Sequence, residues 1–206
     1  MILRRAVLLV PLSCPAALVP PLPAAWSKTL VVPSPIIDDL SDPSGLSALG
    51  TRWQLVTDRV MGGVSQGTLA REQVAGRPAL VMRGDVRLEN NGGFVQMALD
   101  LAHPDAAGGG TLDAGAWQGL EIDVLGAPQA YSLHLRTTDL ERPWQSYRQG
   151  FAARPEWHRL RLTFADFAAH RTEAPLDLTR LRRLGIVAIG RAFTADLAVG
   201  GVRFFG

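Results

Sequence analysis

The stretch GLEIDVLGAPQAYSLHLR, residues 119–136, carries the pattern that decides the fold. In each half, apolar residues alternate with charged or polar ones: Leu120, Ile122 and Val124, then Tyr131, Leu133 and Leu135. A period of two is typical of a strand with one face in the core and the other in water. Gly126-Ala-Pro128 between the halves is a turn signal. The stretch therefore predicts two strands separated by a turn.

The same patterns recur along the chain. Residues 160–164 alternate in the same way, and more continuous apolar runs predict buried strands at 79–82, 94–101, 184–189 and 197–205. Only residues 164–169 and 177–184 allow a helical turn or two, and residues 36–40 fit a short helix or an edge element. Strands without interleaved helices indicate an all-β antiparallel sandwich or barrel. We expect fewer than about a fifth of the residues to be helical, against an average near a third.

Composition limits the classes of partner. The chain has 206 residues, enough for one domain, with a formal net charge of +2. Without Arg4 and Arg5, which lie in a leader-like stretch, 19 basic residues face 19 acidic ones. This balance gives no basic footprint, so we expect no nucleic-acid partner. The single cysteine, Cys14, lies in the same leader, so the body offers no thiol for a disulfide, catalysis or zinc.

Residues 1–27 resemble a signal peptide. Arg4-Arg5 precede an uncharged run over residues 6–19, and Ala25-Trp-Ser27 is a small-x-small cleavage site. The run is too short to span a bilayer comfortably, and no other stretch approaches a transmembrane segment. Several prolines interrupt the run, so a misplaced start or an irregular arm is the alternative. We expect a periplasmic or secreted protein if the leader is real and a cytoplasmic one otherwise, with a lead-in at 28–50 and one domain at 51–206.

A G-x-S-x-G sequence at residues 63–67 matches the nucleophile elbow of α/β-hydrolases. That elbow needs a buried strand before the serine and a helix after it. Here residues 57–61 are too polar for a central strand, and residues 68–76 are short and end in a turn. We therefore expect Ser65 to be a turn residue and predict no catalytic residues, and hence no enzyme.

Metal, cofactor and ligand signals are weak. The four histidines are scattered without an H-x-x-x-H pair, so we expect no metal site and no cofactor. Asp58, Asp85 and the segment 89–91 offer oxygen ligands near glycines, but their spacing matches no compact calcium loop, and turn capping explains them better. Trp144 and Tyr147 flank polar residues, as aromatic residues that stack on sugar rings or anchor a partner do; packing beneath a loop is the alternative.

Two segments contain specific motifs that composition alone does not explain. WQLVTDRVMGGVSQG at residues 53–67 resembles the W-x4-D-x-V-M-G-G-x-S-x-G signature of the complex I intermediate-associated protein 30 family. GDVRLENNGGF at residues 84–94 resembles the G-x-V-x-L-x-N-N-G-G-F block of the same family. Looser similarity continues to residue 205, so the resemblance covers nearly the whole body. One departure is Gln96-Met-Ala98, where the family usually carries an arginine.

The resemblance implies a jelly-roll β-sandwich of the galactose-binding-domain-like type, in a family whose eukaryotic members assist the assembly of respiratory complex I. It implies no catalytic residues. The family-motif residues that are candidates for binding are Asp58, Met61, Gly62, Gly63, Ser65, Asn90, Asn91, Gly92, Gly93 and Phe94. We predict that Asp58, Ser65, Asn90 and Asn91 form one hydrogen-bonded cluster, with Met61 and Phe94 packed against it or beneath it.

These observations leave two functions open. The first is a non-catalytic binding or assembly-factor module that holds a protein client, such as a respiratory-complex subunit. The second is a module of the cell envelope that binds a carbohydrate or another small ligand, for which Trp144 and Tyr147 would supply stacking. An exported protein would fit the second function better, because the soluble arm of bacterial complex I is assembled on the cytoplasmic side.

Overall fold

The two alternating stretches form strands β8 (Gly119–Gly126) and β9 (Ala130–Thr137), which lie in opposite sheets of a β-sandwich. The structure is a computed structural model that describes residues 29–31, 34–102 and 110–206, so the predicted leader at 1–27 lies outside the described residues. Strands make up 55% of the described residues and helix 8%, as predicted, and all of this helix is in short 3-10 turns. The predicted all-β jelly-roll sandwich is confirmed.

Sheet A has eight strands. Its central order is β3-β6-β13-β9-β10-β12, and β7 pairs with the start of β13 and carries β1 at its other edge. The β1–β7 pair is parallel and the other pairs are antiparallel. The bounds are β1 Thr29–Val31, β3 Trp53–Thr57, β6 Phe94–Asp100, β7 Thr111–Asp113, β10 Ser146–Ala152, β12 Ala168–His170 and β13 Leu181–Ile189.

Sheet B has six strands in the order β11-β8-β14-β5-β4, and β2 pairs with the end of β14. Its bounds are β2 Ile36–Asp38, β4 Gln66–Val74, β5 Arg77–Val86, β11 His158–Thr163 and β14 Phe193–Phe205. The predicted helical turns are the 3-10 turns η3 (Phe164–Asp166) and η4 (Leu178–Arg180). The segment at residues 36–40 is an edge strand, and its Ile37 is fully buried in the core.

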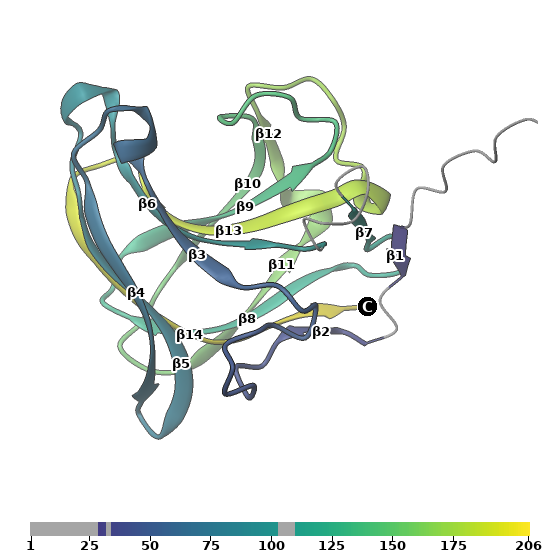
Figure 1. Cartoon of the computed structure of the whole chain (residues 1–206), viewed down its shortest axis with the longest axis horizontal. Helices are drawn as coiled ribbons and strands as arrows, with labels where there is room; N and C mark the ends of the chain where they lie inside the picture. Colours follow the sequence, from purple (N-terminus) through teal and green to yellow (C-terminus); the bar gives the residue numbers. More distant parts are fainter. Residues whose placement is uncertain (1–28, 32–33, 103–109) are drawn as a thin grey trace, which may run out of the picture.

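The core lies between the two sheets, as Figure 1 shows in edge view. One continuous cluster of apolar side chains fills it, including Leu133 and Leu135 from sheet A and Leu120, Ile122 and Val124 from sheet B. The alternation in both stretches therefore points one set of side chains inward from each sheet and the other set outward. As a result, Glu121 and Asp123 reach the outer face of sheet B, whereas Ser132, His134 and Arg136 reach the outer face of sheet A.

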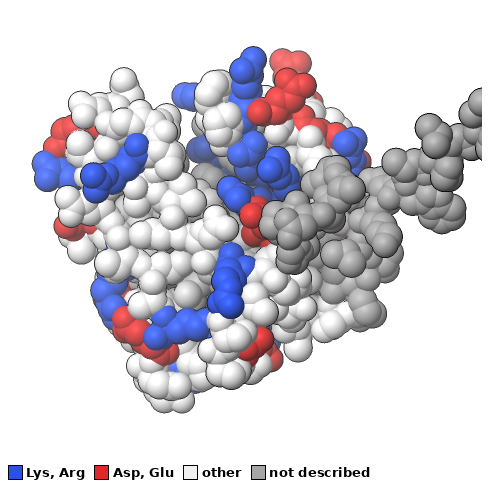
Figure 2. All heavy atoms as spheres, in the orientation of Figure 1, with Lys and Arg blue, Asp and Glu red and all other residues white. Residues whose placement is uncertain are grey.

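Two raised parts flank the outer face of sheet A (Figure 1). At the upper left are the 3-10 turns η1 (Asp58–Met61) and η2 (Glu89–Asn91), which we call the signature wall. At the upper right are β10, β12 and the segments around them, residues 138–145 and 171–176, which we call the opposite wall. The space-filling view shows a notch between the two walls (Figure 2). We call the outer face of sheet A between these walls the hollow.

Candidate ligand-binding face

The carboxylate of Asp58 holds the signature wall together. Its Oδ1 accepts a hydrogen bond from the Ser65 main-chain N–H at 2.9 Å. Its Oδ2 accepts from Ser65 Oγ at 2.5 Å, from Gly93 N–H at 2.6 Å and from Phe94 N–H at 3.3 Å. Ser65 Oγ also accepts from the Arg87 N–H at 2.9 Å. One fully buried carboxylate therefore ties η1 to the segment that follows η2.

The electrostatics of Asp58 favour its charged form. Burial works to raise its pKa, but the hydrogen bonds from Ser65, Gly93 and Phe94 outweigh burial, so the pKa is lowered from its usual value. Ser65 is itself fully buried and donates its hydroxyl proton to this carboxylate. The geometry is that of a loop brace, as expected for a turn serine and not for a nucleophile at an elbow.

Each Gly-Gly pair of the motif combines two separate requirements. Gly62 and Gly93 have φ of 90° and 127°, in the region where a side chain is strained. Gly63 and Gly92 approach the carboxylate closely: a Cβ on Gly63 would lie 2.3 Å from Asp58 Cγ, and one on Gly92 would lie 2.5 Å from Asp58 Oδ2. In each pair, one glycine makes the turn and the other makes room for the brace.

The predicted cluster is correct for Asp58 and Ser65 but wrong for three other residues. The side chains of Asn90 and Asn91 are exposed and make no hydrogen bond within the described ranges. Both asparagines have φ of 57°, a left-handed conformation that asparagine tolerates better than most residues, so they shape the turn through their backbone. Met61 is 57% exposed at the tip of η1 instead of packing beneath the cluster. Phe94 is half-buried beside it.

In the opposite wall, one of the two aromatic residues expected to stack on a ligand is buried instead. Tyr147 is buried in the core side of β10, and its hydroxyl lies 3.0 Å and 2.9 Å from the carbonyl oxygens of Ala174 and Pro175. It anchors the wall and offers no face to a ligand. Trp144 is 47% exposed, in the loop between β9 and β10. Arg136 holds that loop beside the hollow by donating to the carbonyl of the preceding Pro143.

The floor of the hollow follows from the strand register. One row of outward residues crosses sheet A: Gln54, Ala98, Gly185, His134, Arg148 and Ala168. Three of these six are Ala or Gly, so long polar side chains can lie flat over the sheet. The amide of Gln96 lies over Gly185, where a Cβ would come within 2.5 Å of its Nε2. Gln96 stands in the segment where the family usually has arginine.

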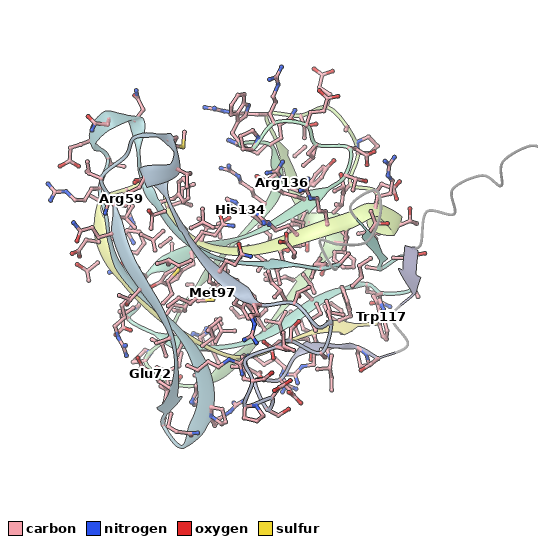
Figure 3. The ribbon with its side chains drawn as sticks, in the orientation of Figure 1. Arg59, Glu72, Met97, Trp117, His134 and Arg136 are labelled. Atoms are coloured by element: carbon pink, nitrogen blue, oxygen red, sulfur yellow. The ribbon has the colours of Figure 1, made fainter. Side chains whose placement is uncertain are left out.

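Three basic side chains project from this row and the neighbouring one. Figure 3 places His134 and Arg136 above β9, between the two walls. Arg136 donates to the main-chain carbonyls of Leu140, Arg142 and Pro143 at 2.9 to 3.3 Å. Arg148 is paired with His134 in the sheet register, and its Nε donates to Ser146 Oγ at 2.8 Å. Neither arginine forms an ion pair with a carboxylate in the described part of the chain.

Every charged group that shifts these bases is itself a cation. Burial lowers the pKa of Arg136, and Arg182 and Arg183 lower it further. Burial and Arg171 lower the pKa of Arg148. Burial lowers the pKa of His134 to about 3, with smaller contributions from Arg148 and His170. His134 is only 8% exposed, and its Nε2 is buried without a hydrogen-bond partner in the described residues. The hollow thus carries uncompensated positive charge, visible as basic side chains gathered beside the notch in Figure 2.

Sequence reasoning missed these residues. The alternation placed His134 on the polar side of its strand, which suggested an ordinary surface histidine. The signal that would have found the hollow is the row that places small residues of β6, β12 and β13 in register with His134 of β9 and Arg148 of β10, and this row depends on the register. Two shallow depressions of about 210 and 290 Å3 lie elsewhere, along β4, β5 and β14.

Other classes of site have little support in the described residues. No group of three or more His, Cys, Asp or Glu side chains in residues 29–31, 34–102 and 110–206 gathers closely enough to hold a metal ion. In the same ranges, no helix has the length and apolar character needed to cross a membrane.

The fold and this face together define a galactose-binding-like β-sandwich with a walled, basic sheet face. The model of the complex I intermediate-associated protein 30 (CIA30) family matches residues 42–199, most of the chain. The chain therefore belongs to the CIA30 family, as the two motifs predicted. No curated protein matches the sequence.

Solved structures of similar fold include carbohydrate-binding modules. A family 11 carbohydrate-binding module from Clostridium thermocellum, solved with a β-1,3-1,4-mixed-linked tetrasaccharide, is 11% identical, with a TM-score of 0.63 over 84% of this chain and 95% of that one. The family 30 module of the cellulosomal cellulase Cel9D-Cel44B from the same organism is 16% identical, with a TM-score of 0.51 over 68% of this chain and 82% of that one. At these identities the likeness shows the fold alone.

Proposed function

We propose that this chain is a non-catalytic binding module that takes a glycan in the hollow of sheet A. The observation that carries the proposal is the polar floor of the hollow. The Gln96 amide lies over Gly185, and Arg136 and Arg148 extend from the outer faces of β9 and β10 between the two walls. Sugars are bound through hydrogen bonds to such side chains and through contact with an aromatic ring. Trp144 at the rim offers such a ring.

Two further facts support a glycan. The similar modules bind, by their descriptions, carbohydrate. The predicted leader would export the protein to a compartment where glycans are abundant. The serine and carboxylate of the family motif serve as a brace for the wall, which supports a role without catalysis.

The test is to fill the hollow. Gly150 lies on the outer face of β10 opposite Ser132, and a Cβ there meets nothing closer than 3.9 Å. Gly150→Trp should project an indole into the hollow without disturbing the sheet and should abolish binding on a glycan array. Ala70→Trp, on the exposed face of β4 in sheet B, is the matched control and should bind as the wild type does. Equal binding by Gly150→Trp and wild type would place the site elsewhere.

A second candidate function is the holding of a protein client, and one observation favours it. Val60 and Met61 at the tip of η1 are 75% and 57% exposed, and Leu88 beside η2 is 51% exposed. Exposed apolar side chains at the tip of a braced loop are suited to contact a protein. The family name also points to complex I assembly.

Crosslinking separates the two candidates. A photoreactive amino acid in place of Met61 should capture a respiratory-complex subunit if the client hypothesis holds, and the Val60→Ser/Met61→Ser variant should lose that partner without losing any glycan. Cell fractionation adds a second criterion, because a periplasmic protein has no access to the cytoplasmic arm of complex I.

A further inference from the structure

The positive charges of Arg136 and Arg148 have no carboxylate partner among the described residues. Arg148 makes one hydrogen bond, to a neutral serine hydroxyl, and its two terminal nitrogens form no hydrogen bond or ion pair in the described residues. Arg136 is satisfied by carbonyl oxygens, which accept its protons but do not neutralise its charge. Desolvating a cation without a counterion costs free energy, so such an arrangement is favoured where a ligand supplies the anion.

A second, independent observation lies in the same place. His134 is more than nine-tenths buried on the outward side of β9, directly beside Arg148 in the register, with its Nε2 unpartnered. Its lowered pKa means that the imidazole is neutral near pH 7. A neutral imidazole adds no positive charge beside Arg148. His134 and Arg148 are therefore cross-strand neighbours in the floor of the hollow, and Arg136 lies two residues further along β9 on the same outer face.

The neighbouring carboxylate, Asp100, is already paired with another arginine. Asp100 forms a bidentate pair with Arg183, at 2.7 and 3.0 Å, at the edge of the hollow. That pair leaves Arg136 and Arg148 without a carboxylate partner among the described residues. The geometry also suits a planar or oxyanionic group, because a guanidinium presents parallel N–H donors to two oxygens at once.

We propose that the ligand of the hollow is an acidic glycan, one whose sugars carry a carboxylate or a sulfate, and that Arg148 and Arg136 pair with this anionic group. This inference rests on the proposed function and narrows it. The rim tryptophan then contacts the sugar ring and the arginines select for its charge.

The experiment is calorimetric titration of the whole chain with matched pairs of probes. One pair is tetragalacturonate and its methyl ester, and the other is a sulfated galactan tetrasaccharide and its desulfated form. Within at least one pair, the charged probe should bind about tenfold or more tightly than its neutral partner. The carboxylate and sulfate pairs identify which anion is selected. Added salt should weaken the charged probe far more than the neutral one.

Variants tie this selectivity to the hollow. Arg148→Gln should weaken binding of the charged probe far more than binding of the neutral probe and so remove the preference. Arg148→Lys should restore only part of the preference, because lysine keeps the positive charge but not the parallel N–H donors of a guanidinium. Arg161→Gln, which removes the same charge from the outer face of sheet B, should leave both affinities unchanged. Thermal melting confirms that each variant is folded.

The outcomes separate the inference from the function on which it rests. Equal affinities for charged and neutral probes, both blocked by Gly150→Trp, would overturn the acidic ligand and leave glycan binding intact. Displacement of the charged probe by inorganic phosphate at comparable concentration would show a free-anion site and would also overturn the inference. Absence of binding to any glycan, charged or neutral, would overturn both.

Discussion

The outer faces of both sheets carry arginines, but the charges around these arginines differ between the two faces. On sheet B, Glu121 and Asp123 are only 5% exposed and lie beneath Arg159, Arg161 and Arg203. Arg161 Nε lies 2.7 Å from Glu121, Arg159 Nε lies 2.8 Å from Asp123, and Arg203 bridges both carboxylates. On sheet A, Arg136 and Arg148 face cations. The arginines of sheet B are therefore neutralised by carboxylates of the same sheet, whereas Arg136 and Arg148 are not neutralised by any described carboxylate.

The pKa shifts of the charged groups on the two faces differ in the same way. Burial works to raise the pKa of Asp123, but Arg159 and Arg203 outweigh it and the pKa is lowered, so ionisation of this carboxylate stabilises the folded state. In the hollow, burial and like charge lower the pKa values of Arg148 and His134, so protonation of these groups opposes folding. A face that weakens the fold electrostatically is a better candidate for function than a face that strengthens it.

The largest expected effect tests whether the sheet B charges belong to the fold. Asp123→Asn leaves Arg159, Arg203 and Arg77 around a neutral, nearly buried amide. We expect the free energy of unfolding to fall by about 3 kcal/mol. Urea denaturation measures the loss. A change below about 0.5 kcal/mol would mean that these ion pairs are ordinary surface pairs and would remove the contrast between the faces.

Substitutions in the signature wall should lower the free energy of unfolding almost as much. In Asp58→Asn, an amide NH2 replaces one of two oxygens that accept from Ser65, Gly93 and Phe94, so a donor faces donors whichever way the amide turns. We expect a loss of about 2 to 3 kcal/mol. Ser65→Ala removes the hydroxyl that donates to Asp58 and accepts from the Arg87 N–H, and it should cost about 1 kcal/mol or somewhat more. If both variants unfold at the wild-type urea concentration, the carboxylate is not a brace.

The pH dependence of stability should differ between the faces. The folded-state pKa of His134 is about 3, below its ordinary 6.5, so the unfolded chain binds the extra proton between these values. The contribution of neutral His134 to the free energy of unfolding is complete above about pH 6.5. It falls by about 1.4 kcal/mol per pH unit as the pH drops toward 3. The contribution of Asp123, whose pKa is lowered from 3.8, is lost only as the pH falls below about 4. His134→Gln should therefore flatten the stability profile between pH 6.5 and 4, measured by urea titration at each pH; an unchanged slope there would contradict the assignment.

The smallest expected effect on the free energy of unfolding comes from a substitution in the hollow. Arg148→Gln removes a cation that has no acidic partner among the described residues, so the free energy of unfolding should change by less than about 0.5 kcal/mol or rise. Denaturation side by side with Asp123→Asn makes the comparison direct. A loss as large as that of Asp123→Asn would reveal that Arg148 is part of the scaffold.

Much of the fold was predictable because it depends on local patterns. Alternation placed β8, β9 and β11 close to their observed bounds. The apolar runs placed β6 closely but found only parts of β5, β13 and β14, which are longer than predicted. The segment that became β10 was missed because Trp144, Tyr147 and Arg148 give no clean alternation. The family motif correctly marked Asp58 and Ser65 as central, but it could not reveal that Asn90 and Asn91 act through backbone conformation, or that Met61 points outward.

The sequence by itself determined the all-β class, the strands and the glycine-rich braced loops, since these follow from the two-residue period of a strand and from steric limits at glycine. Only the tertiary structure decided which outward side chains would meet. β8 and β9 are neighbours in the chain, yet they join opposite sheets, so the acids of the first and the bases of the second never pair. His134 comes to lie between Arg148 and Gly185 because the register of β9 with β10 and β13 places them there. Register depends on the packing of whole sheets, and no local pattern contains it.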